Sequence, residues 1–390
     1  MIGKYIIWLV TFLLLVCLSG CNDMREIDQR GMVLGISIDQ GEEKKYKISI
    51  QLPILTKGQN GGGRLGNSGE FEVLWSEGDT VWEALTNLES KTPNVLFFGH
   101  LKVIVISEKI AESSINGSLD LVDRIPDIGN KVFLIISKDE EASKFLKTDS
   151  SLIKLPALYV NRYFHADKKL ARAKPMRIFQ YRRDTNTVSA AAVIPMAKTI
   201  ESEIIIENMA VLKEDRLVEI LQGNEVAASQ LIKGEKVEEL NYVTEIESKG
   251  KLVTVSLSRI MLESNVDLQK VAPVTFDIQV SGKGNIVELS AGETSKDFIK
   301  KLEAKLNQDI KTDIIQTIEK LKNANVEPWL LGQKIWIKDQ TFFDSLKWKE
   351  EGFKEAIFNV NVDFTIDTTG QKGLFNKSPI YQKSPREAGV

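Results

Sequence analysis

Hydrophobic and polar residues alternate along several stretches of this chain, as they do in half-buried β-strands. The alternation is clearest in residues 46–52, 252–260 and 356–366. Two further stretches, residues 101–106 and 131–136, are almost continuously apolar, which is typical of strands buried on both faces. The pattern therefore predicts a protein rich in β-sheet.

Three pairs of strand-like runs enclose turn sequences and predict β-hairpins. The pairs are residues 32–39 with 46–52 around Gly41–Glu43, 204–212 with 216–221 around Lys213–Asp215, and 274–280 with 285–289 around Gly282–Gly284. A glycine-rich stretch, residues 58–69, predicts a loop, and residues 71–75 predict a further strand.

In other segments apolar residues recur with the period of an α-helix. In the longest, residues 295–322, seven apolar side chains form one stripe, and Thr294 with Asp297 fits a capping box. At a rise of 1.5 Å per residue this helix would be about 40 Å long and could cover one face of a sheet. Shorter helices are predicted from Asp79 or Thr80 onward, within residues 107–123 and near residues 224–232. Interleaved helices and strands indicate an α+β fold with helices on mixed sheets.

The N-terminal residues carry the pattern of a signal peptide followed by a lipid-attachment site. Lys4 precedes an apolar run of about a dozen residues, fewer than the roughly 20 that span a bilayer. Leu18-Ser19-Gly20-Cys21 then matches a bacterial lipobox, in which small side chains admit the peptidase and the cysteine thiol accepts a diacylglyceryl group. Cleavage would leave lipidated Cys21 as the first residue of the mature chain. The two acyl chains of the lipid would anchor it stably in the membrane. An ordinary signal peptide and an uncleaved anchor are the alternatives.

Cysteine, histidine and charge counts limit the remaining chemistry. The 390 residues include two cysteines, two histidines, 51 Lys plus Arg and 54 Asp plus Glu, for a net charge of −3. This balance argues against nucleic-acid binding, and two cysteines cannot build a Cys-rich zinc site. Cys17 would leave with the leader, so we expect no disulfide, no metal and no cofactor beyond the lipid on Cys21. Beyond the leader no stretch approaches 18 apolar residues, so the rest should be a soluble body outside the membrane.

Fragments of catalytic motifs are present but lack the rest of each pattern. Ser151 and Lys154 have the Ser-x-x-Lys spacing of penicillin-recognising enzymes, but Ser-Asp-Asn and Lys-Thr-Gly do not occur in the sequence. His100 and His165 stand in unrelated contexts, and neither has a second histidine four residues on. A basic segment with interleaved aromatics, residues 162–183, is either a solvated helix and loop or a surface for anionic lipid or an acidic partner.

Five segments together resemble the C-subunit lipoproteins of bacterial spore germinant receptors, the Ger(x)C family. The segments are residues 20–27 with 33–39, 98–106, 208–221, 325–332 after the long helix, and 358–366 with Thr369-Gly370. Three residues depart from the family pattern: Asn22, where an aromatic usually follows the cysteine, and Glu327 and Trp329, where a small residue, Asp and Pro usually precede a Gly-rich stretch.

The resemblance implies an α+β lipoprotein of three mixed sheet-and-helix domains without catalytic activity. With the patterns above, it divides the chain into a signal peptide (1–20), an N-terminal domain (21–198), a strand-rich middle domain (199–262), a C-terminal domain with the long helix (263–370) and a tail (371–390). It implies a place on the outer face of the inner spore membrane beside two polytopic receptor subunits that respond to nutrients. The site residues it carries over are the anchor Cys21 and its cleavage sequence Leu18, Ser19 and Gly20.

Two other functions fit parts of the sequence. A solute-binding lipoprotein of an importer would show regular strand–helix alternation in both halves, whereas residues 199–290 predict strands with one short helix. A cell-wall enzyme would need a cluster of acids or a nucleophile–base pair, which the sequence does not display.

Overall fold

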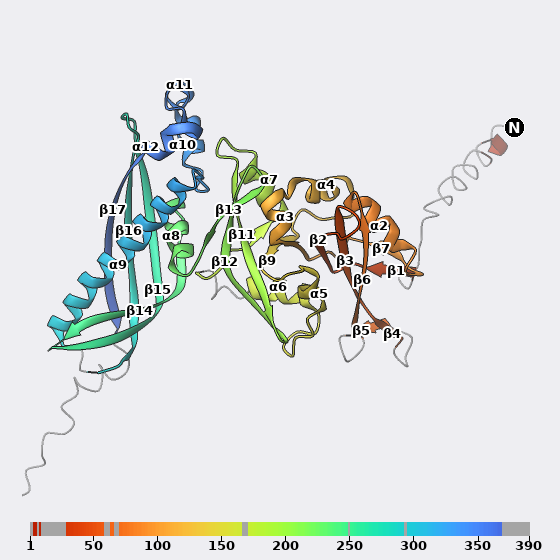
Figure 1. Ribbon diagram of the computed structural model, residues 1–390, viewed down its shortest axis with the longest axis horizontal. Helices are drawn as coiled ribbons and strands as arrows, with labels where there is room; N and C mark the ends of the chain where they lie inside the picture. The colour runs from red at the N-terminus through yellow and green to blue at the C-terminus, as the bar shows by residue number, and fades with distance from the viewer. Residues whose placement is uncertain are drawn as a thin grey trace, which may run out of the picture.

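The computed structural model describes residues 3–5, 8, 29–57, 63–65, 70–165, 171–248, 250–291 and 295–368. Two lobes lie side by side (Figure 1). The first lobe comprises residues 29–221 around a large mixed sheet, and the second comprises residues 224–368 around a sheet of long strands. The predicted α+β class is therefore confirmed.

The sheet of the first lobe has a parallel centre with antiparallel strands on both sides. In spatial order its strands are β13 (Arg216–Leu221), β12 (Glu203–Lys213), β11 (Ala191–Ile200), β9 (Phe133–Ser137), β8 (Val103–Ser107), β2 (Gly35–Gln40), β3 (Tyr46–Pro53) and β6 (Phe71–Gly78). Strands β11, β9, β8 and β2 are parallel neighbours, and the others pair antiparallel. Four of these strands, β2, β3, β8 and β9, are buried on both faces, which explains the nearly continuous apolar sequence of β8 and β9. Shorter pairings join β10 (Met176–Arg177) to β9, β1 (Arg30–Met32) to β7 (Val95–Phe97), and β4 (Leu55–Lys57) to β5 (Gly63–Leu65).

Helices cover both faces of this sheet. One face buries apolar side chains of α2 (Val81–Glu89), α3 (Glu108–Ser113), α4 (Asn116–Arg124) and α7 (Ile178–Thr185). The opposite face buries those of α5 (Ser143–Lys147) and α6 (Pro156–His165). The apolar cluster on the α5 and α6 face continues through Leu221 into the second lobe, so the two lobes share one hydrophobic core.

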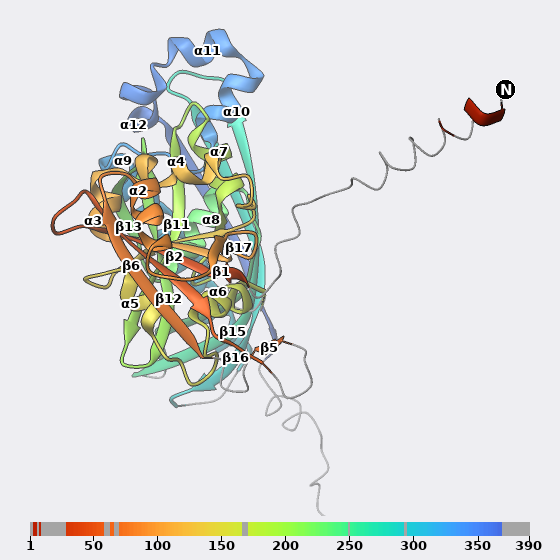
Figure 2. The ribbon, with the colours of Figure 1, turned by 90° about the vertical axis from the view of Figure 1, so that its right-hand side faces the viewer.

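The second lobe is a four-stranded sheet covered on one face by helices. Its strands are β14 (Val237–Ser248), β15 (Lys251–Gln269), β16 (Thr275–Leu289) and β17 (Ile357–Thr368), in that spatial order. The long helix α9 (Lys296–Asn323) crosses the sheet, and α8 (Asn224–Lys233) lies between it and the first lobe (Figure 1). All seven residues of the predicted apolar stripe of α9 are buried, which confirms the helix. At one end, α10 (Leu331–Lys338), α11 (Gln340–Ser345), a π-turn (Trp348–Gly352) and α12 (Phe353–Glu355) project beyond the sheets (Figure 2).

The structure corrects two details of the predicted elements. Gly282 and Gly284 form no hairpin turn, because β16 runs through them without interruption. A side chain at Gly282 would come within 2.4 Å of Leu262 Cδ2, so the glycines let β16 approach the bulged part of β15. Helix α9 begins one residue later than predicted, and the hydroxyl of Ser295 caps it by accepting from Phe298 N at 3.2 Å.

The sheets do not follow the predicted division at residues 198/199 and 262/263. The β12–β13 hairpin, assigned to a middle domain, extends the sheet of the first lobe, and β15 runs through residue 262. A strand pairs with whichever sheet edge the fold places beside it, and its own sequence does not determine which strand that is. The number of domains stays a prediction.

Among the described residues, no helix has both the length and the apolar content needed to cross a membrane.

Candidate functional site

The residues predicted to carry the lipid, Cys21 and its cleavage sequence Leu18, Ser19 and Gly20, lie outside the described residues, as does the tail from residue 371. The described body starts at Gln29, beside β1, which pairs in parallel with β7.

The other sequence candidates are not brought together. His100 is exposed after β7 and packs edge-on against Phe97, with ring centroids 5.8 Å apart. His165 ends α6, where its Nδ1 lies 2.5 Å from Asn161 O. Lys154 pairs with Asp149 at 2.8 Å rather than with Ser151. In the part of the chain that the structure describes, no three His, Cys, Asp or Glu side chains form a group suited to a metal ion.

Among the described Lys and Arg side chains of residues 162–183, three are exposed and three are partly buried in the first lobe; the exposed ones are Arg162, Arg172 and Arg183. The guanidinium of Arg177 lies 5.0 Å from the centre of the Phe133 ring, and Arg182 donates to Leu119 O at 3.2 Å. Arg183 pairs at 2.7 Å with the buried carboxylate of Asp184. Lys168 and Lys169 lie outside the described residues.

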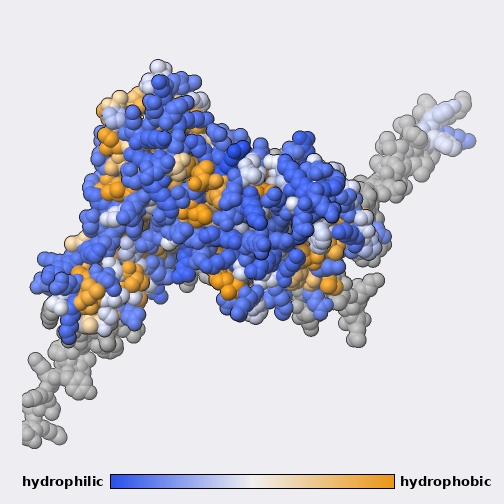
Figure 3. All heavy atoms as spheres, in the orientation of Figure 1, coloured by the Kyte–Doolittle hydropathy of each residue, from blue (hydrophilic) through white to orange (hydrophobic). Residues whose placement is uncertain are grey.

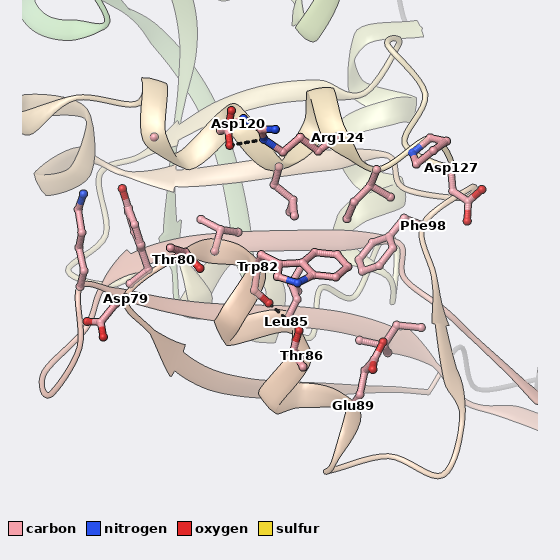
Figure 4. Close-up of a pocket in the computed structure, with 18 of the residues that line it drawn as sticks. Asp79, Thr80, Trp82, Leu85, Thr86, Glu89, Phe98, Asp120, Arg124 and Asp127 are labelled. Carbon is pink, nitrogen blue, oxygen red and sulfur yellow. Dashed lines mark hydrogen bonds and ion pairs between the residues drawn. The ribbon is translucent and has the colours of Figure 1, made fainter.

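A groove of about 820 Å³ lies between α2 and α4 in the first lobe (Figure 4). Two local features position α2. Thr80 caps it by accepting from Glu83 N at 3.1 Å, and Gly78 lets the chain turn closely onto it, since a Cβ there would lie 2.5 Å from Ala84 N. The apolar stripe of α2 faces the sheet, so the next position around the helix, Trp82, lies at the opening of the groove with 60 % of its surface exposed.

The groove, hereafter the α2–α4 groove, has an apolar floor and a charged rim. Its apolar residues come from three parts of the chain: Val81, Trp82, Leu85, Leu96, Phe98, Leu121, Ile125 and Pro126. Among the described side chains of the lining, the acids are Asp79, Glu89, Asp120 and Asp127, and the bases are Lys45 and Arg124. Arg124 donates to Asp120 at 2.7 Å, and this bond holds the pKa of the Asp120 carboxyl below its usual value.

Sequence analysis missed this groove. Its signal is Trp82, a large apolar residue one position away from the stripe formed by Val81, Leu85 and Leu88, where a solvated helix would carry a polar side chain.

A second polar constellation joins the two lobes at Glu327, one of the positions that depart from the family pattern. Its carboxylate is 4 % exposed and accepts from Trp329 N at 2.7 Å, Leu331 N at 3.0 Å, Gly332 N at 3.0 Å and the Ser189 hydroxyl at 2.6 Å. Ser189 precedes β11, so this last bond crosses between the lobes. Burial raises the pKa of Glu327, while the four hydrogen bonds act in the opposite direction.

Two further bonds support the same junction. Lys213 Nζ donates to Asn325 O at 2.7 Å, and Val188 N donates to the side chain of Gln333 at 3.2 Å. The segment from Asn325 to Gln333 is therefore fixed to the first lobe at three points. In the sequence this site is visible only as Glu327, a carboxylate directly before Pro328. The sequence does not indicate which groups this carboxylate binds.

Two residues of the segment at 33–39 also gain a physical role. Gly35 lets α5 and α6 pack onto the sheet, because a Cβ would lie 2.8 Å from Leu146 Cδ2 and 3.2 Å from Ala157 Cβ. The buried carboxylate of Asp39 accepts from Ala142 N at 2.5 Å and Ser143 N at 3.0 Å, at the start of α5. Burial is the main cause that raises the pKa of Asp39.

Comparisons with known proteins cover nearly the whole chain. Residues 23–199 match the family described as spore germination protein N-terminal domain, and residues 207–370 match the family described as spore germination B3/GerAC like, C-terminal. The putative spore germination protein YfkR of Bacillus subtilis is 25 % identical over 378 residues, covering 92 % of this chain and 95 % of its own. Spore germination protein B3 of Bacillus subtilis is 24 % identical over 377 residues, covering 93 % of this chain and 98 % of its own.

One solved structure shares the fold. The crystal structure of the GerBC protein superposes with a TM-score of 0.54 at 19 % identity, covering 85 % of this chain and 97 % of that one.

Proposed function

Because the chain belongs to the spore germination B3/GerAC-like family, we propose that it is a lipid-anchored, non-enzymatic subunit of a germinant receptor that initiates spore germination. The observation that carries this proposal is the match to both family domains in order, over residues 23–199 and 207–370. It confirms the family predicted from the sequence.

In this proposal Cys21 carries a diacylglyceryl lipid after cleavage behind Leu18-Ser19-Gly20, and the body stands on the outer face of the inner spore membrane. Two polytopic subunits of the receptor are its partners. Support comes from the lipobox and from several relatives that are named as spore germination proteins.

A binding role, rather than catalysis, is supported by how the α2–α4 groove uses its hydroxyls. Thr80 accepts from Glu83 N at 3.1 Å and Thr86 donates to Trp82 O at 3.0 Å, so both serve the helix itself. An acyl or phosphoryl transfer site would instead direct a nucleophile and a base at one point.

The anchor is tested by exchanging each leader-proximal cysteine separately. Cys21→Ala should abolish incorporation of a radiolabelled fatty acid and release the protein from the membrane fraction. Cys17→Ala is the matched control and should label and fractionate like the unaltered protein. Equal labelling of the Cys21→Ala protein would refute the assignment.

A further inference from the structure

We infer that the α2–α4 groove docks a basic, partly apolar segment of a partner protein. The inference rests on the proposed function in one respect: it names the face through which a receptor subunit would meet a partner. Much of the surface in Figure 3 is hydrophilic, and hydrophobic residues gather in separate patches.

The first observation is the exposed Trp82 beside an apolar floor. A tryptophan that leaves 60 % of its surface in water loses most of the free energy that its burial would provide. Tryptophan is also the residue type most enriched among those that dominate protein interfaces. In Figure 4 the indole lies next to Phe98 and Leu85 and borders the space below α4. A partner side chain entering there would cover the indole and the floor together.

The second observation is the charge of the rim. Among the described lining residues, four carboxylates face two cations. Arg124 is already paired with Asp120, and Lys45 lies 5.0 Å from the centre of the Tyr46 ring. Asp79, Glu89 and Asp127 are thus available to lysine or arginine on an incoming segment, and such complementarity speeds and orients association.

The third observation indicates that the groove fits a protein segment better than a small nutrient. Small-molecule sites direct several polar groups at one ligand in a largely enclosed space. Here the two threonine hydroxyls are used inside α2, and the carboxylates stand apart: Asp79 and Glu89 lie at opposite ends of α2, and Asp120 and Asp127 lie in α4 and just after it. Two helices flanking an apolar channel resemble instead the grooves that accept a helix or loop of another protein.

The test is site-specific photocrosslinking in spores with the full-length chain. A photoreactive phenylalanine analogue at Thr86, an exposed lining residue, should crosslink to one protein. Mass spectrometry of the crosslinked peptide should show apolar residues flanked by Lys or Arg. Trp82→Ala should lower the yield at least tenfold and Trp82→Phe should restore most of it. Trp75→Ala is the matched control, since Trp75 is 46 % exposed but lies outside the groove.

Charge is tested separately. The double exchange Glu89→Lys and Asp127→Lys should abolish the crosslink, whereas Glu245→Lys with Glu247→Lys, the same charge change on exposed positions of β14, should leave it. Equal unfolding midpoints for all variants exclude misfolding as the cause.

Three results would overturn the inference. They are a crosslinked peptide that is acidic or carries no apolar residue, a crosslink to lipid, and a nutrient-induced thermal shift of the purified protein that Trp82→Ala removes. These results differ from a failure of the proposed function. If Trp82→Ala spores germinate normally while deletion of the chain blocks germination, the groove assignment fails and the receptor role stands.

Discussion

Replacing Glu327 probes the bonds that join the two lobes. Glu327→Ala leaves three backbone N–H groups, those of Trp329, Leu331 and Gly332, without their buried acceptor. Each unsatisfied buried group costs about 1–3 kcal/mol, so we expect the free energy of unfolding to fall by at least about 3 kcal/mol.

Glu327→Gln is the more discriminating variant. Its carbonyl oxygen can keep the bonds from Trp329 N and Leu331 N, both of which reach Oε1. Its amide would face the N–H of Gly332, which donates to Oε2, while the Ser189 hydroxyl can turn to accept. One donor is then lost, and the expected cost is about 1–3 kcal/mol.

Denaturant unfolding of the purified protein near pH 5 measures both values. The order should be unaltered protein, then Gln, then Ala, with the Ala variant also unfolding in two phases if the lobes separate. Glu245→Gln, on an exposed position of β14, serves as control and should change stability little. Values for both Glu327 variants within about 0.5 kcal/mol of the unaltered protein, the usual range for surface exchanges, would refute the reasoning.

The pH dependence of the free energy of unfolding is a second test of the role of Glu327. Burial raises the folded-state pKa of Glu327 above its ordinary value of 4.5. The stability that this raised pKa contributes is fully present below about pH 4.5 and is lost as pH rises through the folded pKa. Glutamine does not titrate, so the stability advantage of the unaltered protein over Glu327→Gln should shrink with rising pH. An advantage that grows with pH would contradict the assigned direction.

Two further substitutions test packing in the second lobe. Gly332→Ala places a Cβ 2.3 Å from Trp348 Nε1, so the indole must shift, and unfolding measurements should show a loss of about 1–3 kcal/mol; a neutral result would mean that the indole moves freely. Leu306→Ala removes a fully buried side chain from the stripe of α9 and should cost about 2–5 kcal/mol by denaturant unfolding, against little for the exposed neighbour in Lys305→Ala; equal effects of the two exchanges would contradict the placement of the stripe.

Local patterns were sufficient for many elements of this fold. The apolar stripe of α9 and the alternation in β15 and β17 each follow from the side-chain period of one element. The pairing of the β12–β13 hairpin with the first sheet does not, because it depends on which edge is left free elsewhere in the chain. The turn predicted at Gly282–Gly284 was wrong, since glycine marks close approach of another strand as readily as a turn.

The candidate sites divide in the same way. The lipobox is predicted from one contiguous stretch of sequence, whereas the α2–α4 groove is assembled from residues between 45 and 127 that no spacing connects. Glu327 was singled out as a departure from the family pattern, but its role depends on Ser189, 138 positions away. Such sites become visible when the fold has placed their parts together.

The central claim is that this chain belongs to a working germinant receptor. It is tested most directly by the loss of optical density of spores after addition of individual nutrients, in a strain that retains the genes of this receptor as its sole germinant receptor. Deleting the chain should abolish the response to every nutrient that this receptor detects, and the restored wild-type chain should return it. Spores that lack the chain and still respond at the unaltered rate would contradict the account.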